Sequence, residues 1–129
     1  MSASKKKGTA WETAICRFLA TEGFPHVERR ALSGTQDRGD VAGIPGWVIE
    51  AKNHGRDGLG GWVDEALIEQ ANDGALHAAV WHHRRGKSSP ADGFVTLTGA
   101  NFVRLLREAG YGDPLPEPPA EGLTWKPDA

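Results

Sequence analysis

Apolar residues recur every three or four positions in three segments of the chain, a spacing that places them on one face of a helix. The clearest series is Trp11, Ile15, Phe18 and Leu19. The spacing predicts helices over residues 8–22, 62–72 and 101–109. In the second helix, we expect the buried face to carry Val63, Ala66, Leu67 and Ala71. Gly23 and Gly74 follow the first two helices, where helices commonly end.

Five short segments between and after these helices are rich in β-branched and aromatic residues and predict strands. They cover residues 26–32, 40–44, 47–53, 75–81 and 93–98. Pro45-Gly46 separates the second and third strands, which is typical of a tight hairpin. The predicted order is therefore α-β-β-β-α-β-β-α. It indicates an α/β domain in which helices flank a mixed β-sheet.

Length and composition are those of one globular domain. The chain has 129 residues, of which 39% are hydrophobic and 25% are charged. We expect a single domain over residues 1–111, with residues 1–7 as a basic N-terminal arm. Residues 112–129 are rich in proline and acidic residues and predict an extended tail.

Two absences narrow the expected cellular setting. No apolar run approaches the ~20 residues of a membrane span, and the N-terminus lacks the apolar segment of a signal peptide. Cys16 is the only cysteine, which excludes an internal disulfide and a multi-cysteine zinc site. We therefore expect a cytoplasmic protein without a membrane partner.

The net charge of −2 argues at first against a nucleic-acid partner, but the tail has four acidic residues against Lys126 alone and so accounts for the net negative charge. Residues 1–111 hold 14 basic and 13 acidic residues. Local basic clusters matter more for phosphate binding than the total charge does. The candidate DNA-contacting residues are Lys5, Lys6, Lys7, Arg29, Arg30, Arg38, His82, His83, Arg84, Arg85 and Lys87. For the segment 82–87, a merely solvated loop is the alternative.

The segment 47–52 places ionisable side chains on an otherwise apolar strand. Because side chains alternate along a strand, Val48, Glu50 and Lys52 share one face. Charges on such a face are costly unless something compensates them, and a divalent cation would compensate a carboxylate. Pro45-Gly46 lies about midway between Asp40 and Glu50, so a hairpin in register pairs these positions approximately and brings the two carboxylates together.

Glu12 is a third candidate acid, because it lies three residues before Ile15, on or beside the buried face of the first helix. Each acid also has an ordinary structural explanation. Glu12 could be a solvated acid in the first turn of a helix, and Asp40 could cap the preceding loop. Glu50 and Lys52 could form ion pairs on a half-exposed sheet. Asp37 is a rival acid close to Asp40.

Taken together, these residues resemble the PD-(D/E)XK nuclease superfamily, and within it the archaeal-type and phage Holliday junction resolvases. The likeness covers most of residues 7–100. It depends on Lys7-Gly8, Glu12, Arg29-Arg30, Ser33-Gly34, Gly39-Asp40-Val41 and Val48-Ile49-Glu50-Ala51-Lys52. The resemblance implies a restriction-endonuclease-like fold.

The resemblance also implies a set of catalytic roles. Glu12, Asp40, Glu50 and the carbonyl of Ala51 would bind Mg²⁺, for which Mn²⁺ would substitute. Lys52 would be the catalytic lysine, and Ser33 would support the site. The expected substrate is DNA in the form of a four-way junction, cut symmetrically by a homodimer.

Two other functions stay open from the sequence. The first is a nicking or restriction-type nuclease without preference for junctions, and the second is a catalytically silent nucleic-acid-binding module. Two side chains are also open to more than one interpretation. Gln70 could lie near the site or be an amide on the helix flank, and Trp62 could stack on a base or on a partner.

Overall fold

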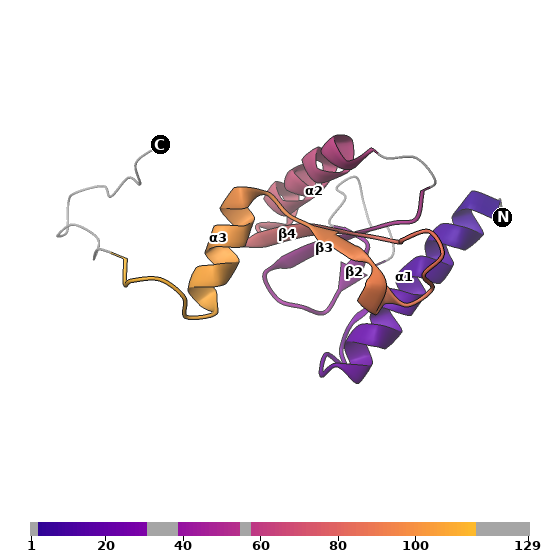
Figure 1. Cartoon of the computed structure of the whole chain (residues 1–129), viewed down its shortest axis with the longest axis horizontal. Coiled ribbons are helices and arrows are strands. Elements are labelled where there is room, and N and C mark those ends of the chain that lie inside the picture. Colours follow the sequence, from indigo (N-terminus) through magenta and orange to yellow (C-terminus); the bar gives the residue numbers. More distant parts are fainter. Residues whose placement is uncertain (1–2, 31–38, 55–57, 116–129) are drawn as a thin grey trace.

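The computed structural model describes residues 3–30, 39–54 and 58–115 (Figure 1). It contains three α-helices and one short 3-10 helix, which are α1 (Ala3–Thr21), α2 (Leu59–Asp73), η1 (Pro90–Asp92) and α3 (Gly99–Glu108). Its five strands are β1 (Glu28–Arg29), β2 (Val41–Ala42), β3 (Trp47–Lys52), β4 (His77–His82) and β5 (Phe94–Thr96). No helix in these three segments is long and apolar enough to cross a membrane.

The strands form one sheet in the order β1-β2-β3-β4-β5. All neighbouring pairs are antiparallel except β3 and β4, which are parallel and are connected through α2. A parallel pair needs such a crossover, because the chain must return to the edge where the first strand began. The prediction of an α/β domain with a mixed sheet is therefore confirmed, whereas the closer likeness to restriction endonucleases stays a prediction.

The sheet is covered by α1 on one face and by α2 on the other, as Figure 1 shows. Alternation along β3 divides the core between the two faces. Ile49 packs with Trp11 and Ile15 of α1. Val48, from the opposite face of β3, packs with Ala66 of α2. The same alternation turns Glu50 towards α2, and this places a carboxyl group inside the second layer.

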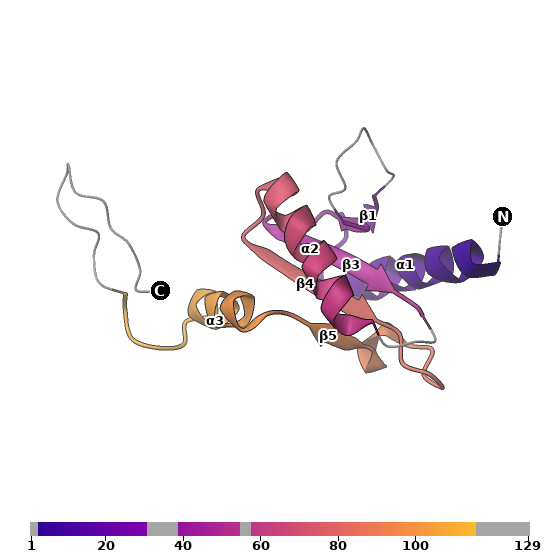
Figure 2. The same ribbon diagram turned by 90° about the horizontal axis from the view of Figure 1, so that it is seen from above.

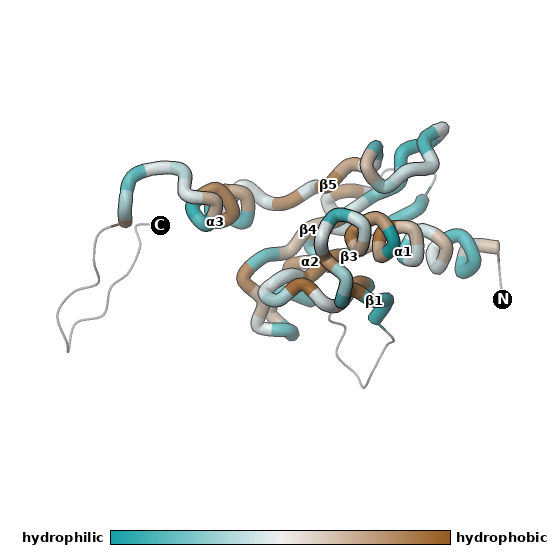
Figure 3. Tube along the Cα trace, turned by 90° about the horizontal axis from the view of Figure 1, so that it is seen from below, coloured by the Kyte–Doolittle hydropathy of each residue, from teal (hydrophilic) through white to brown (hydrophobic). Residues whose placement is uncertain are grey.

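Helix α3 lies beyond the end of the sheet rather than on one of its faces (Figure 2). Polar contacts attach it to the domain: Asn101 exchanges hydrogen bonds of 3.1 and 3.2 Å with Gln70 of α2. His77 Nε2 lies 2.7 Å from Glu108 Oε2. Apolar residues of α3, among them Phe102 and Val103, remain exposed. In Figure 3 the trace of α3 lies apart from the sheet and includes brown, hydrophobic segments.

Several predicted boundaries differ from the structure, among them those of the first helix, the first strand and the tail. Helix α1 begins at Ala3, so Lys5, Lys6 and Lys7 lie on its first turns and not on a separate arm. Lysine is a good helix former, and the single Gly8 does not end the helix. Of the strand expected over residues 26–32, the described residues 26–30 form only the short strand Glu28–Arg29. Of the expected tail, residues 112–115 are irregular and residues 116–129 lie outside the described residues.

Candidate metal centre

The hairpin of β2 and β3 brings Asp40 and Glu50 together as predicted. Val41 pairs with Ile49, so the next pair outward is Asp40 opposite Glu50. The Asp40 N–H donates to the Ile49 carbonyl at 2.9 Å. The Ala51 N–H donates in turn to Asp40 Oδ2 at 2.8 Å. These two bonds fix both the backbone and the carboxylate of Asp40 at the edge of β3.

Gly39 allows this close approach. Its φ of +94° lies in the region that favours glycine, and a Cβ at this position would lie 3.0 Å from Val48 Cγ1. A side chain before Asp40 would therefore strain the backbone and collide with the strand that carries Glu50.

Glu50 is one of two acids in the described part of the chain that are almost fully buried. It is only 2% exposed, and its Oε2 has no hydrogen-bond partner in the part of the chain that the structure describes. Burial, followed by the nearby carboxyl groups of Asp40 and Glu69, raises the pKa of Glu50 to about 11. Without a cation the group is therefore protonated at neutral pH, and one buried oxygen has no ligand.

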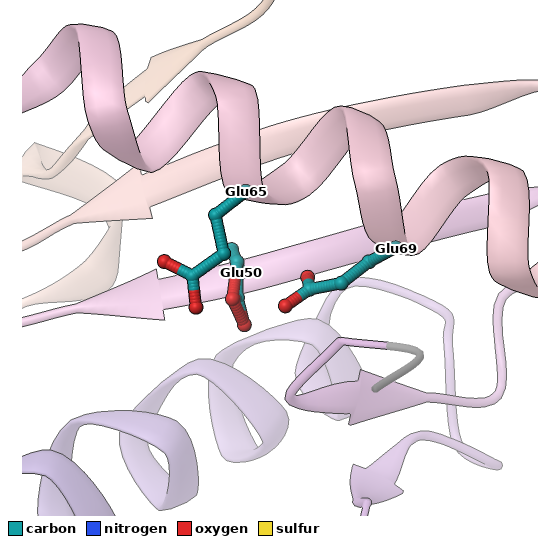
Figure 4. Close-up of side chains that lie close together, drawn as sticks. All are labelled: Glu50, Glu65 and Glu69. Carbon is teal, nitrogen blue, oxygen red and sulfur yellow. The ribbon is translucent and has the colours of Figure 1, made fainter. Parts of the chain in front are cut away.

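Two glutamates of α2 complete a cluster around Glu50. Glu65 and Glu69 are four residues apart, so both project from the same side of the helix. Figure 4 shows them pointing towards Glu50 on β3. One carboxylate oxygen from each of the three residues lies within 4.8 Å of the other two. Glu69 is 1% exposed, whereas the Glu65 side chain is 46% exposed, which makes Glu65 the solvent-facing side of the cluster.

Glu65 and Glu69 were not predicted as site residues, because the buried face expected for α2 is only partly correct: Ala66 is buried and Val63 packs against the core. Leu67 was expected to be buried and is 37% exposed, and Ala71 is also exposed. The buried residues of the helix are Ala66 and Glu69. The available signal was the series Val63, Ala66 and Glu69, which has helical spacing but ends on a charged residue.

Lys52 lies at the open side of this carboxylate cluster (Glu50, Glu65 and Glu69). Its Nζ lies 3.1 Å from Glu65 Oε2, and its side chain is 16% exposed. Burial lowers the pKa of Lys52, but the hydrogen bond to Glu65 and the surrounding carboxyl groups outweigh burial and raise the pKa above its ordinary value of 10.5. Lys52 is therefore a fixed positive charge at neutral pH, and it cannot act there as a general base.

Glu12 lies beside Asp40 and not in the carboxylate cluster. Its Oε2 forms an ion pair of 3.0 Å with Arg29 of β1. Burial, followed by the charge of Asp40, raises the pKa of Glu12 despite this ion pair. The structure thus connects Glu12 to Asp40 and Asp40 to Glu50. The ligand roles predicted for Glu12, Asp40 and the Ala51 carbonyl stay predictions.

The remaining predicted residues divide into three groups. Ser33 and Arg38, together with the rival acid Asp37, lie outside the described residues. Arg29 and Arg30 pair with carboxylates, and the partner of Arg30 is Asp73 at 3.4 Å. The basic segment 82–87 begins at His82, the last residue of β4, and contains a turn in which the Lys87 N–H donates to the Arg84 carbonyl at 3.0 Å.

Gln70 has a structural role, because its side-chain amide forms hydrogen bonds with the Ala75 carbonyl and with Asn101.

The donor atoms of the cluster fit a hard divalent cation. Carboxylate oxygens are the ligands that Mg²⁺ and Mn²⁺ prefer, whereas zinc favours histidine and cysteine. The buried Oε2 of Glu50 supplies a second, independent indication, because an ion beside it would replace the missing hydrogen bond. Glu50, Glu65 and Glu69 therefore form the candidate metal centre, with Asp40 and Lys52 adjoining it.

Metal binding is expected to stabilise the fold through this cluster. Mn²⁺ at 100 times its Kd would add about 2.7 kcal/mol to the free energy of unfolding, which corresponds to several degrees in Tm. Glu69→Gln should lose most of the increase, and Asp64→Asn is the matched control, because Asp64 is an exposed acid on the same helix. Thermal unfolding followed by circular dichroism, with Mn²⁺ or with EDTA, measures the effect. Equal increases in the two variants would exclude Glu69 as a ligand.

Comparison of the chain with protein-family models, with curated proteins and with solved structures gives no match.

Proposed function

We propose that this protein is a metal-dependent endonuclease that hydrolyses phosphodiester bonds in DNA. The observation that carries the proposal is the buried Glu50, whose Oε2 has no hydrogen-bond partner in the described part of the chain. It faces two further glutamates of the cluster, and a protonated lysine lies at the exposed side. A buried carboxyl group without a ligand lowers stability, so a binding role gives a physical reason for its presence.

The cluster suits phosphodiester hydrolysis because it combines both kinds of charge that the reaction needs. A bound divalent ion polarises the phosphate and lowers the pKa of a coordinated water. Glu50, Glu65 and Glu69 would hold the ion, and Asp40 would add negative charge beside them. Lys52 stays protonated and would stabilise the negative charge that develops on the phosphate oxygens.

The narrower form of the proposal is a Holliday junction resolvase that acts as a symmetric homodimer. It depends on the resemblance of Glu12, Asp40 and the segment 48–52 to the PD-(D/E)XK resolvases. A junction has two equivalent strands to cut, and a single small domain carries one site. A two-fold dimer would therefore place one site at each strand.

A cleavage assay on two substrates tests both levels of the proposal. Purified protein is incubated with a labelled four-way junction and with a linear duplex of the same arms, in Mg²⁺ or in EDTA. We expect Mg²⁺-dependent paired nicks that are confined to the junction. If the protein cleaves both substrates, it is a nuclease without a preference for junctions. If it binds both substrates but cleaves neither, it is a catalytically silent nucleic-acid-binding module.

A further inference from the structure

A continuous row of aromatic and cationic groups runs across α2, β4 and β5 and the segments that follow β3 and β4. The His54 ring centroid lies 5.6 Å from that of Trp62, and Trp62 lies 5.9 Å from His82. His82 lies 5.6 Å from Phe94. The row ends where Arg84 places its guanidinium carbon 4.6 Å from the centroid of Phe94. We call His54, Trp62, His82, Phe94 and Arg84 the ring row.

The ring row lies next to the exposed side of the metal centre. His82 is the residue of β4 that pairs with Lys52 of β3. Trp62 precedes Glu65 by three residues on α2, so the two side chains are neighbours on the helix surface. The middle of the ring row therefore adjoins both members of the Lys52–Glu65 ion pair.

The ring row is accessible, and its members are held in place. Phe94 is 52% exposed, and His54 is exposed. Trp62 and His82 are half-buried. The Nε2 atom of His82 lies 3.0 Å from Thr96 Oγ1. Gly58 packs closely on the indole of Trp62, since a Cβ there would lie 3.0 Å from Nε1. Rings that are fixed before binding lose little conformational freedom when a flat ligand stacks on them.

Charge complementarity indicates the class of ligand. Beside Arg84, the turn carries Arg85 and Lys87, both exposed. Aromatic side chains with neighbouring cations are the usual surface for single-stranded nucleic acid, because the rings stack on bases and the cations contact phosphates. A paired duplex buries its bases within the stack and offers the rings no equivalent surface.

We propose that the ring row is a stacking platform for unpaired bases of DNA. The inference rests on the proposed nuclease function and narrows its substrate to DNA in which unpaired nucleotides adjoin the cleaved bond. Single-stranded flaps, ends and opened branch points have this property. The unpaired strand would pass along the ring row, and the paired part would present its phosphate to Lys52.

Binding measurements on a conservative variant test the platform. Phe94→Leu removes the ring and retains an apolar side chain at a half-exposed position, so the fold should be preserved. Phe24→Leu is the matched control, because Phe24 is 43% exposed and lies outside the ring row. Fluorescence anisotropy in EDTA measures the affinity of each protein for labelled oligo(dT) and for a labelled duplex.

We expect Phe94→Leu to weaken binding of oligo(dT) by about five- to tenfold, in keeping with the loss of one base–aromatic stack. Binding of the duplex should not change, and Phe24→Leu should bind both probes as the wild type does. Unchanged oligo(dT) binding in Phe94→Leu, or an equal loss for the two probes, would overturn the platform. Trp62→Phe should retain most of the affinity, because it preserves a ring.

A Mg²⁺ cleavage assay separates this inference from the proposed function. Binding of oligo(dT) that depends on Phe94, in a protein that cuts no DNA, would support the platform and contradict the nuclease. Cleavage of a fully paired duplex at the same rate by the wild type and Phe94→Leu would support the nuclease and contradict the platform.

Discussion

Glu50→Gln is expected to stabilise the metal-free protein at neutral pH while removing its ability to bind a divalent cation. In the folded protein the pKa of Glu50 is about 11, against an ordinary value of 4.5. At pH 7 the unfolded chain is ionised at this residue, so folding must take up a proton. Each pH unit above 4.5 costs about 1.4 kcal/mol, which makes a cost of about 3 kcal/mol at pH 7.

The sign of the pH dependence follows from the raised pKa. The folded state binds more protons than the unfolded state between about pH 4.5 and pH 11, so the metal-free wild type should lose stability as the pH rises through this window. Glutamine is neutral at every pH and should remove this slope. At pH 7 the variant should be more stable than the wild type by about 1–3 kcal/mol.

In the presence of divalent cations, the wild type should be more stable than Glu50→Gln. The wild type should gain stability in Mg²⁺ or Mn²⁺, and its metal affinity should rise with pH, because binding displaces the proton of Glu50. Glu50→Gln should show neither effect. Urea unfolding at several pH values, with EDTA or with metal, measures how the free energy of unfolding depends on pH and how much metal binding increases it. A variant less stable than the wild type in EDTA would contradict a protonated Glu50.

Lys52→Met is expected to abolish cleavage and to leave metal binding intact. Methionine has an unbranched side chain that fills the space of the lysine stem without its charge. Removal of a fixed charge that stabilises a transition state commonly costs about 100- to 1,000-fold in rate. Metal affinity should stay the same or increase, because a positive charge 3.1 Å from Glu65 is lost.

Initial cleavage rates and Mn²⁺-induced changes in Tm should be measured together for Lys52→Met. Arg17→Met is the control, since Arg17 is an exposed cation on α1 that lies outside the predicted DNA contacts. It should cleave at nearly the wild-type rate. If Lys52→Met also retained the wild-type rate, the lysine would have no catalytic role. If it lost metal binding along with cleavage, the separation of roles proposed for Lys52 and the glutamates would be wrong.

The half of the candidate site on the hairpin could be predicted from the sequence. Strand alternation placed Glu50 and Lys52 on one face, and the turn at Pro45-Gly46 predicted that Asp40 lies approximately opposite Glu50. Both rules are local, since they depend on the period of a strand and the position of a turn. The pairing of Val41 with Ile49 confirms the register.

The half of the site on α2 could not be predicted in the same way. A helix with apolar residues at several angles has more than one possible buried face, and Glu69 looks like a surface residue until the helix is docked on β3. Its burial depends on the tertiary packing of Ala66 against Val48 and Val80. The ring row is harder still, because its members come from segments up to 40 residues apart that only the sheet brings together.

One measurement tests the central claim most directly: the initial rate of DNA cleavage by the wild type and by Glu50→Gln, side by side, in Mg²⁺ and in EDTA. A four-way junction and the same junction with single-stranded flaps serve as substrates. We predict products only from the wild type and only in Mg²⁺, with at least about a 100-fold loss in Glu50→Gln. Equal rates in the two proteins, or cleavage that persists in EDTA, would contradict a metal-dependent nuclease built on this cluster.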